Sequence, residues 1–198
     1  MGKTKDLIPL KELNLTNRFL FDEVLEDPQT HQDILSIIFG RDIPLLEQNE
    51  TEKELRGIAH LRAVRMNVYA MDEEKLVYNT EMQQKKFWYG RYVYTFRAGC
   101  LEEPDCCLED GAVRIFLNTR GKNDDEVSKE LVGFLRYVED TTDEMAADMD
   151  SERIKRIHNR VRKVKASEEV GVKYMQAWEE RYYDKEEARQ EGLEEGRQ

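Results

Sequence analysis

The chain has few of the residues that bind structural metals or build disulfide frameworks. Of its 198 residues, three are cysteine and three are histidine. Cys100, Cys106 and Cys107 are odd in number and include an adjacent pair, which is not the pattern of a disulfide framework, and their spacing fits no zinc site. We therefore expect structural thiols in a reducing compartment.

Long hydrophobic runs are also lacking. No segment approaches a membrane-spanning length, and the opening residues MGKTKDLIPL contain no apolar core of a signal peptide. We expect a cytoplasmic protein without a membrane partner. Hydrophobic residues make up 39% of the chain and charged residues 37%, so the core is modest and the surface, or a helical tail, carries much charge.

Basic residues are fewer than acidic ones, 31 against 42, and the net charge is −11. This charge disfavours non-specific binding of nucleic acid by the whole surface, so a DNA site needs a local basic patch. The densest positive run comprises Arg153, Lys155, Arg156, Arg160, Arg162, Lys163 and Lys165. On a helix these residues could contact phosphates, or they could form a solvated face neutralised by Asp150, Glu168 and Glu169. We expect His158, within the run, at the surface.

Helical signals occur on both sides of a central β region. Asp27 followed by Pro28 is typical of a helix start, and Gly40 is a natural end for that helix. Asn123 and Glu126 resemble a capping box ahead of a second helical pattern.

The last quarter of the chain is predicted to be mainly helical. Residues 141–150 are acidic and are expected to form a loop, and a helix should begin at Ser151 and continue nearly to the end. A narrow apolar stripe should face inward: Ile154, Ile157, Val161 and Val164. A second stripe follows: Val170, Tyr174, Met175, Trp178 and Tyr182.

The central segment VRMNVYAMDEEKLVYNTEMQ, residues 64–83, predicts a β-hairpin with a charged turn. A five-residue turn would pair Met71 with Val77 and set Asn67 opposite Glu81. A four-residue turn would put Asn67 and Glu81 on opposite faces unless a bulge intervened. The sequence alone leaves both registers open.

The polar residues of this hairpin are of the types found at Mg²⁺-dependent phosphodiester-cleaving sites, which use hard oxygen ligands. Glu81 can hold a metal, and Gln83 can orient a water or a phosphate but cannot act as a base. Asn67 offers a carbonyl oxygen without negative charge, which should weaken Mg²⁺ binding severely because a charge pair near 4 Å is worth on the order of 4 kcal/mol.

Several segments together resemble the PD-(D/E)XK nuclease family transposases, the recombination-promoting nuclease (Rpn) family. The family motifs "TND-x-x-F", "R-x-D-V-Y" and "YNIEMQ" are similar to TNRFLF at 16–21, RMNVY at 65–69 and VYNTEMQ at 77–83. The segment RIFLNTRG at 114–121 and the E-G-rich tail also resemble the family. The resemblance implies a catalytic triad at Asn67, Glu81 and Gln83, metal ligands at Asn67 and Glu81, Mg²⁺ as cofactor and DNA as partner.

The chain departs from that family in two ways. Asn67 stands where the family has aspartate, and only residues 84–89 lie where family members place a long helix and another core strand. A parallel crossover needs about a dozen residues, so the strand predicted at residues 91–96 must pair antiparallel to the EMQ strand, or the sheet lacks a member. A further strand is predicted at residues 113–118.

We therefore expect an α/β fold, a truncated PD-(D/E)XK core with flanking helices. Residues 1–142 would form the nuclease-like domain, lacking a core helix and strand after residue 86, and residues 143–198 a charged helical region. The expected function is Mg²⁺-dependent DNA endonucleolytic cleavage linked to recombination or transposition, weak or absent in this chain. The alternatives are a non-catalytic DNA-binding or partner-binding protein, which could form a homodimer or pair with an intact family member, and a coding remnant without function.

Overall fold

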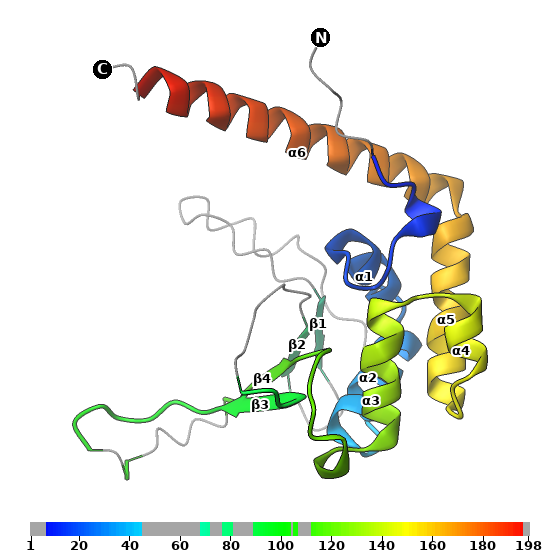
Figure 1. The fold of residues 1–198 in the computed structure, drawn as a ribbon, viewed down its shortest axis with the longest axis vertical. Helices are drawn as coiled ribbons and strands as arrows, with labels where there is room; N and C mark the ends of the chain where they lie inside the picture. Colours follow the sequence, from blue (N-terminus) through cyan, green and yellow to red (C-terminus); the bar gives the residue numbers. More distant parts are fainter. Residues whose placement is uncertain are drawn as a thin grey trace.

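The computed structural model describes residues 7–44, 68–71, 77–80, 89–103, 105–106 and 112–195. It is a mixed helix and sheet protein in which a group of helices lies beside short strands (Figure 1). The helices are η1 (Leu10–Glu12), α1 (Arg18–Leu25), α2 (Pro28–Phe39), η3 (Asp124–Glu126), α3 (Lys129–Glu139), α4 (Asp143–Ala147), α5 (Glu152–Ala166) and α6 (Glu168–Glu195). The strands are β1 (Val68–Met71), β2 (Val77–Thr80), β3 (Val93–Phe96) and β4 (Arg114–Leu117).

Helix α2 has the ends that the sequence predicts. The Asp27 side chain accepts a hydrogen bond from the Thr30 backbone N–H at 2.8 Å, and Pro28 occupies the first turn, where its missing N–H is not needed. Gly40 ends the helix in the left-handed conformation with φ of 64°, which glycine adopts without a side-chain clash. Both helix signals are confirmed.

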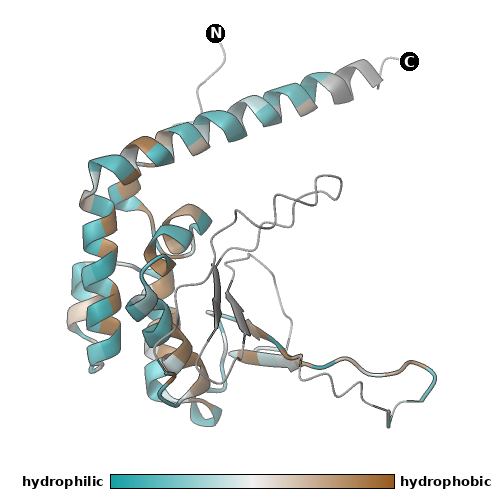
Figure 2. Cartoon of the chain, turned by 180° about the vertical axis from the view of Figure 1, so that it is seen from behind, coloured by the Kyte–Doolittle hydropathy of each residue, from teal (hydrophilic) through white to brown (hydrophobic). Residues whose placement is uncertain are grey.

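The core is built mainly from helices. Most of its buried members come from α1, α2, α3 and α5, and the others are Leu13, Leu15, Tyr92, Ala146 and Tyr174. The predicted inward stripe of α5 is confirmed, because Ile154, Ile157, Val161 and Val164 are all buried. Figure 2 shows hydrophobic positions of these helices turned toward one another. The core therefore spans the expected division at residue 142.

The predicted capping box at Asn123 is wrong. The Asn123 side chain does not cap the short turn η3, and its Oδ1 accepts instead from the Tyr92 backbone N–H at 2.9 Å. Helix α3 begins at Lys129 and is capped by Ser128, whose hydroxyl accepts from the Leu131 N–H at 3.1 Å. The Asn123 side chain therefore binds Tyr92, which is distant in sequence, instead of capping the helix that follows it.

The acidic segment expected to be a loop contains helix α4. Thr142 caps it by accepting from the Met145 N–H at 3.3 Å. The preceding Thr141 is buried, and its hydroxyl accepts from the Leu15 N–H at 2.9 Å and donates to the Tyr137 carbonyl at 3.0 Å. These bonds tie the turn before α4 to the N-terminal segment and to α3.

The described strands form two separate antiparallel pairs, β1 with β2 and β3 with β4. Among the described strands, β3 is thus hydrogen-bonded to β4 and not to β2. Both predicted strand segments, at residues 91–96 and 113–118, are confirmed, with Tyr94 facing Phe116 in the register of the second pair.

Helix α6 follows α5 after a break at Ser167 and extends away from the helical core (Figure 1). Its first turns are attached to the core, because Tyr174 is 6% exposed, packs at a tilt against Phe19 with ring centroids 5.1 Å apart and donates to the Ile8 carbonyl at 2.9 Å. Beyond that point the predicted second stripe is open, with Met175 45% and Tyr182 39% exposed. None of the described helices is long and apolar enough to cross a membrane.

Candidate functional site

The hairpin of β1 and β2 has the register that the functional interpretation requires. Met71 pairs with Val77 and Val68 pairs with Thr80, which confirms the five-residue turn and excludes the four-residue alternative. The expected triad of Asn67, Glu81 and Gln83 lies outside the described residues. The next pair in an unchanged register would be Asn67 with Glu81, and their juxtaposition stays a prediction.

The donor set expected for Mg²⁺ fits that ion poorly. Glu81 brings the only negative charge, and Asn67 and Gln83 bring neutral carboxamides, whereas Mg²⁺ sites in proteins rely on carboxylates. Among the described residues, no three His, Cys, Asp or Glu side chains gather where they could hold a metal. The described thiols, Cys100 and Cys106, are free.

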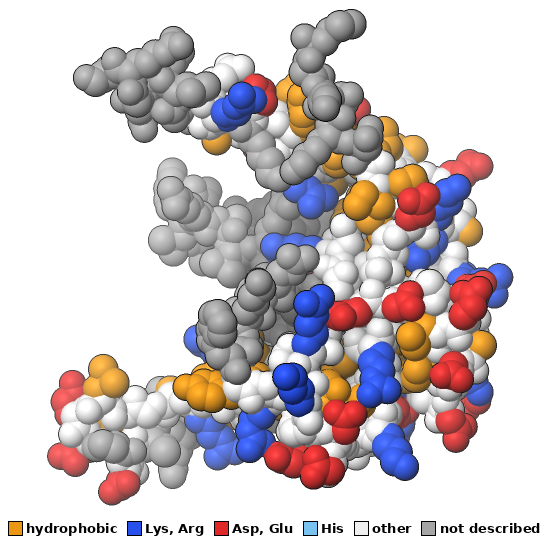
Figure 3. Space-filling view, viewed as in Figure 1, with side chains coloured by type: hydrophobic (Ala, Val, Ile, Leu, Met, Phe, Trp, Pro, Cys, Tyr) orange, Lys and Arg blue, Asp and Glu red, His pale blue; other side chains and the backbone are white. Residues whose placement is uncertain are grey.

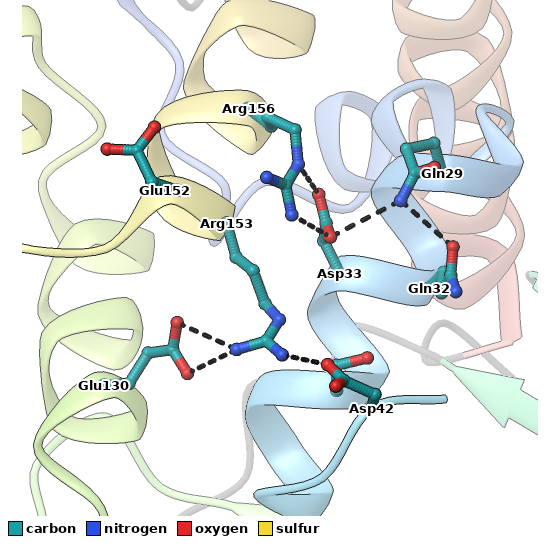
Figure 4. A pocket seen from close by; sticks show the side chains of 9 residues that line it. Gln29, Gln32, Asp33, Asp42, Glu130, Glu152, Arg153 and Arg156 are labelled. Atoms are coloured by element: carbon teal, nitrogen blue, oxygen red, sulfur yellow. Dashed lines mark hydrogen bonds and ion pairs between the residues drawn. The ribbon is translucent and has the colours of Figure 1, made fainter. Parts of the chain in front are cut away.

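The basic residues at the start of α5 are engaged with carboxylates. Arg153 donates through Nη1 to both oxygens of Glu130, at 3.4 and 3.1 Å, and also contacts Asp42. Arg156 donates to both oxygens of Asp33, at 2.8 and 2.7 Å. Figure 4 shows these groups converging from α2, α3, α5 and the segment after α2, which carries Asp42, around a pocket of about 370 Å³.

The next basic residues of α5 have partners as well. Lys155 pairs with Glu152 on the same helix at 2.8 Å. Arg160 donates through Nη2 to the Glu23 carbonyl at 3.1 Å, and its buried Nε has no hydrogen-bond partner within the described chain. Over the visible face in Figure 3, acidic and basic side chains are interspersed rather than gathered in one basic patch. The carboxylates paired with this part of α5 are Asp33, Asp42, Glu130 and Glu152, and Asp150 adds a charge effect on Lys155.

The last turns of α5 differ from its start, because Arg162 and Lys165 line a second pocket, of about 270 Å³. Arg162 and Lys163 are exposed and Lys165 is half-buried. Burial lowers the pKa of the Lys165 ammonium group, and the nearby Asp143 carboxylate partly offsets this effect. The pocket is lined by Lys11, Thr141, Thr142, Asp143, Glu144, His158, Val161, Arg162 and Lys165.

His158 is buried, so the expectation of a surface histidine is wrong. Its Nδ1 lies 2.8 Å from the Tyr137 hydroxyl, and its Nε2 lies 3.0 Å from Asp143 Oδ1. A neutral ring satisfies both contacts when Nε2–H donates to Asp143 and Nδ1 accepts from Tyr137. Burial raises the pKa of Tyr137, with a smaller contribution from Asp143, which keeps the phenol protonated as a donor. The position of His158 four residues after Ile154, on the apolar face, was the available signal of burial.

The chain was also compared with known proteins. Comparisons with protein families, with curated proteins and with solved structures found no match. The functional interpretation therefore depends on the residues of this chain and on their arrangement.

Proposed function

We propose that this chain has the truncated core of a Mg²⁺-dependent DNA endonuclease of the recombination-promoting type, and that its cleavage activity is weak or absent. The observation that supports the proposal is the register of β1 and β2, in which Met71 faces Val77. This register directs Asn67 and Glu81 toward one another if the pairing continues by a single step, and a shift by one residue would separate them.

The residues have unequal chemical roles in this proposal. Glu81 is the only carboxylate of the set, and Gln83 orients a water or a phosphate oxygen without taking a proton. Asn67 can coordinate only through a neutral carbonyl, so the set lacks the second charge that holds a divalent cation beside a phosphate. We attribute the expected loss of activity to the absence of this second charge.

A plasmid-nicking assay with Mg²⁺ or Mn²⁺ tests the proposal. It compares the unchanged chain with Asn67→Asp and with Asn67→Asp combined with Glu81→Ala. We expect the unchanged chain to be nearly inert, Asn67→Asp to nick, and the added Glu81→Ala to abolish nicking, because a second carboxylate restores the metal site. If folded Asn67→Asp stays inert, the endonuclease proposal fails.

A second candidate function is binding of a partner protein without catalysis. The specific observation in its favour is the open face of α6, where Trp178 and Tyr182 stack with ring centroids 5.5 Å apart and Tyr183 is 68% exposed. Exposed aromatic residues close together are typical of protein interaction surfaces. An inert Asn67→Asp variant that still forms a defined complex would favour this candidate.

A further inference from the structure

We propose that the pocket between η1, α4 and the last turns of α5 binds a phosphoryl oxyanion through Lys11, Arg162 and Lys165. The two possible sources of this group are a free phosphate and the backbone of DNA, and we infer DNA. The choice of DNA rests on the proposed function, whereas the oxyanion site stands on the geometry of the pocket alone.

The two ends of α5 differ in how their cations are engaged. Toward its start, Arg153 and Arg156 are each bound by carboxylates, and Arg160 is held by a backbone carbonyl. Toward its end, Arg162 makes no hydrogen bond or ion pair through its side chain with another described residue, and the same is true of Lys11. Unengaged cations are the ones that can neutralise an arriving phosphate.

The cations Lys11, Arg162 and Lys165 line one concave site instead of a flat surface. Lys11 comes from η1, whereas Arg162 and Lys165 come from α5 one turn apart. Among the described residues, the hydrogen-bond partner of the Lys165 ammonium is the Thr141 carbonyl, at 3.4 Å, and the Asp143 carboxylate acts on it through its charge. Burial lowers the pKa of Lys165, which means that its charged form is under-solvated in the pocket. A phosphoryl oxygen would supply the missing partner.

Two acidic groups, Asp143 and Glu144, face the same pocket. Asp143 Oδ1 lies 3.0 Å from His158 Nε2, and the other nitrogen of that ring is held by Tyr137, so the carboxylate has a partner of its own. Glu144 lies on the short helix α4 and is exposed. A neutral imidazole does not cancel the charge of Asp143, so three cations face two carboxylates in this pocket and its net charge is positive.

Cations at the end of α5 also have a simpler role than phosphate binding, which is to stabilise the C-terminus of the helix. Lys163 and Lys165 lie in the last turn of α5, where positive charge complements the partial negative charge of a helix C-terminus. That role does not require a pocket, so it makes Lys163, which lies outside the pocket lining, as important as Lys165. The difference between these neighbours is the basis of the test.

The experiment compares two double variants with the same loss of charge on the same helix. Arg162→Gln with Lys165→Gln removes the pocket cations, and Lys155→Gln with Lys163→Gln is the matched control outside the pocket. Inorganic phosphate binding is measured by isothermal titration calorimetry, and binding of a fluorescent DNA duplex by anisotropy over a range of salt concentrations. Neither assay requires cleavage, so inactivity in plasmid nicking would not affect the result.

We expect the pocket variant to lose about tenfold or more in affinity for both phosphate and DNA, with a salt slope lower by about two, and the control to change by less than about twofold for phosphate. Equal behaviour of the two variants would overturn the site. Loss of phosphate binding with unchanged DNA binding would overturn DNA as the source and support a free phosphate. If the pocket variant does not fold, Arg162→Gln alone provides the same comparison with Lys163→Gln.

Discussion

At the scale of single residues, His31 ties the stability of the protein to pH. Its side chain is buried in α2, and burial lowers its pKa from 6.5 to about 4. Between these values the unfolded chain binds a proton that the folded chain does not bind, so stability falls as the pH falls through this range. The stabilising contribution is present above about pH 6.5 and lost by about pH 4.

We predict that this histidine accounts for up to about 3 kcal/mol of the pH dependence of unfolding. Urea unfolding of the unchanged chain and of His31→Gln, measured from pH 7 to pH 4, gives the difference in unfolding free energy at each pH. As the pH falls, the unchanged chain should lose more unfolding free energy than the His31→Gln variant. A difference that stays constant with pH would contradict the assignment.

At the scale of elements, α5 is held to α2 by the pair of Arg156 and Asp33. Asp33 is 3% exposed, and both of its oxygens accept from the one guanidinium group. Because half of Arg156 is exposed, the pair is partly hydrated, and its main role is to satisfy a buried carboxylate. Without the arginine, that carboxylate would be buried without its cation.

We predict that Arg156→Gln lowers the unfolding free energy by about 1.5–3 kcal/mol. Arg162→Gln, which removes an exposed guanidinium from the same helix, should change it by less than about 0.5 kcal/mol. Adding Asp33→Asn to Arg156→Gln should recover part of the loss, because the buried charge is gone. Equal losses in the two single variants would show that the pair contributes nothing specific.

The elements that sequence patterns predicted well are those whose signals are local. The cap at Asp27, the stop at Gly40 and the inward stripe of α5 all depend on neighbours within a turn of helix. Asn123 was misassigned because the backbone of Tyr92 competes for its side chain.

Contacts with residues distant in sequence also explain what the sequence alone missed at the candidate sites. The carboxylates that engage the start of α5 lie on distant segments, so the basic run looked uniform although only its end is open. The contacts of His158 with Tyr137 and Asp143 likewise join separate helices. The hairpin register was one of two alternatives until the strand pairs were known.

At the scale of the whole molecule, the core is built mainly from helices, whereas the candidate catalytic hairpin is built from the strands β1 and β2. The core joins helices from both ends of the chain, with α5 packed on α1 and α2, and α6 extends from it (Figure 1). Of the candidate catalytic residues, Asn67 comes directly before β1, and Glu81 and Gln83 come after β2 in the sequence. The central claim is therefore that, in the intact protein, the register of this hairpin continues to Asn67 and Glu81.

Disulfide trapping tests that claim most directly. In a background with Cys100, Cys106 and Cys107 replaced by serine, Asn67→Cys is combined either with Glu81→Cys or with Thr80→Cys, and each protein is oxidised with oxidised glutathione and mapped by mass spectrometry. Directly opposed strand positions can form a disulfide, whereas positions on opposite faces cannot. We predict a disulfide in the Glu81→Cys pair and none in the Thr80→Cys pair; the reverse pattern would contradict the account.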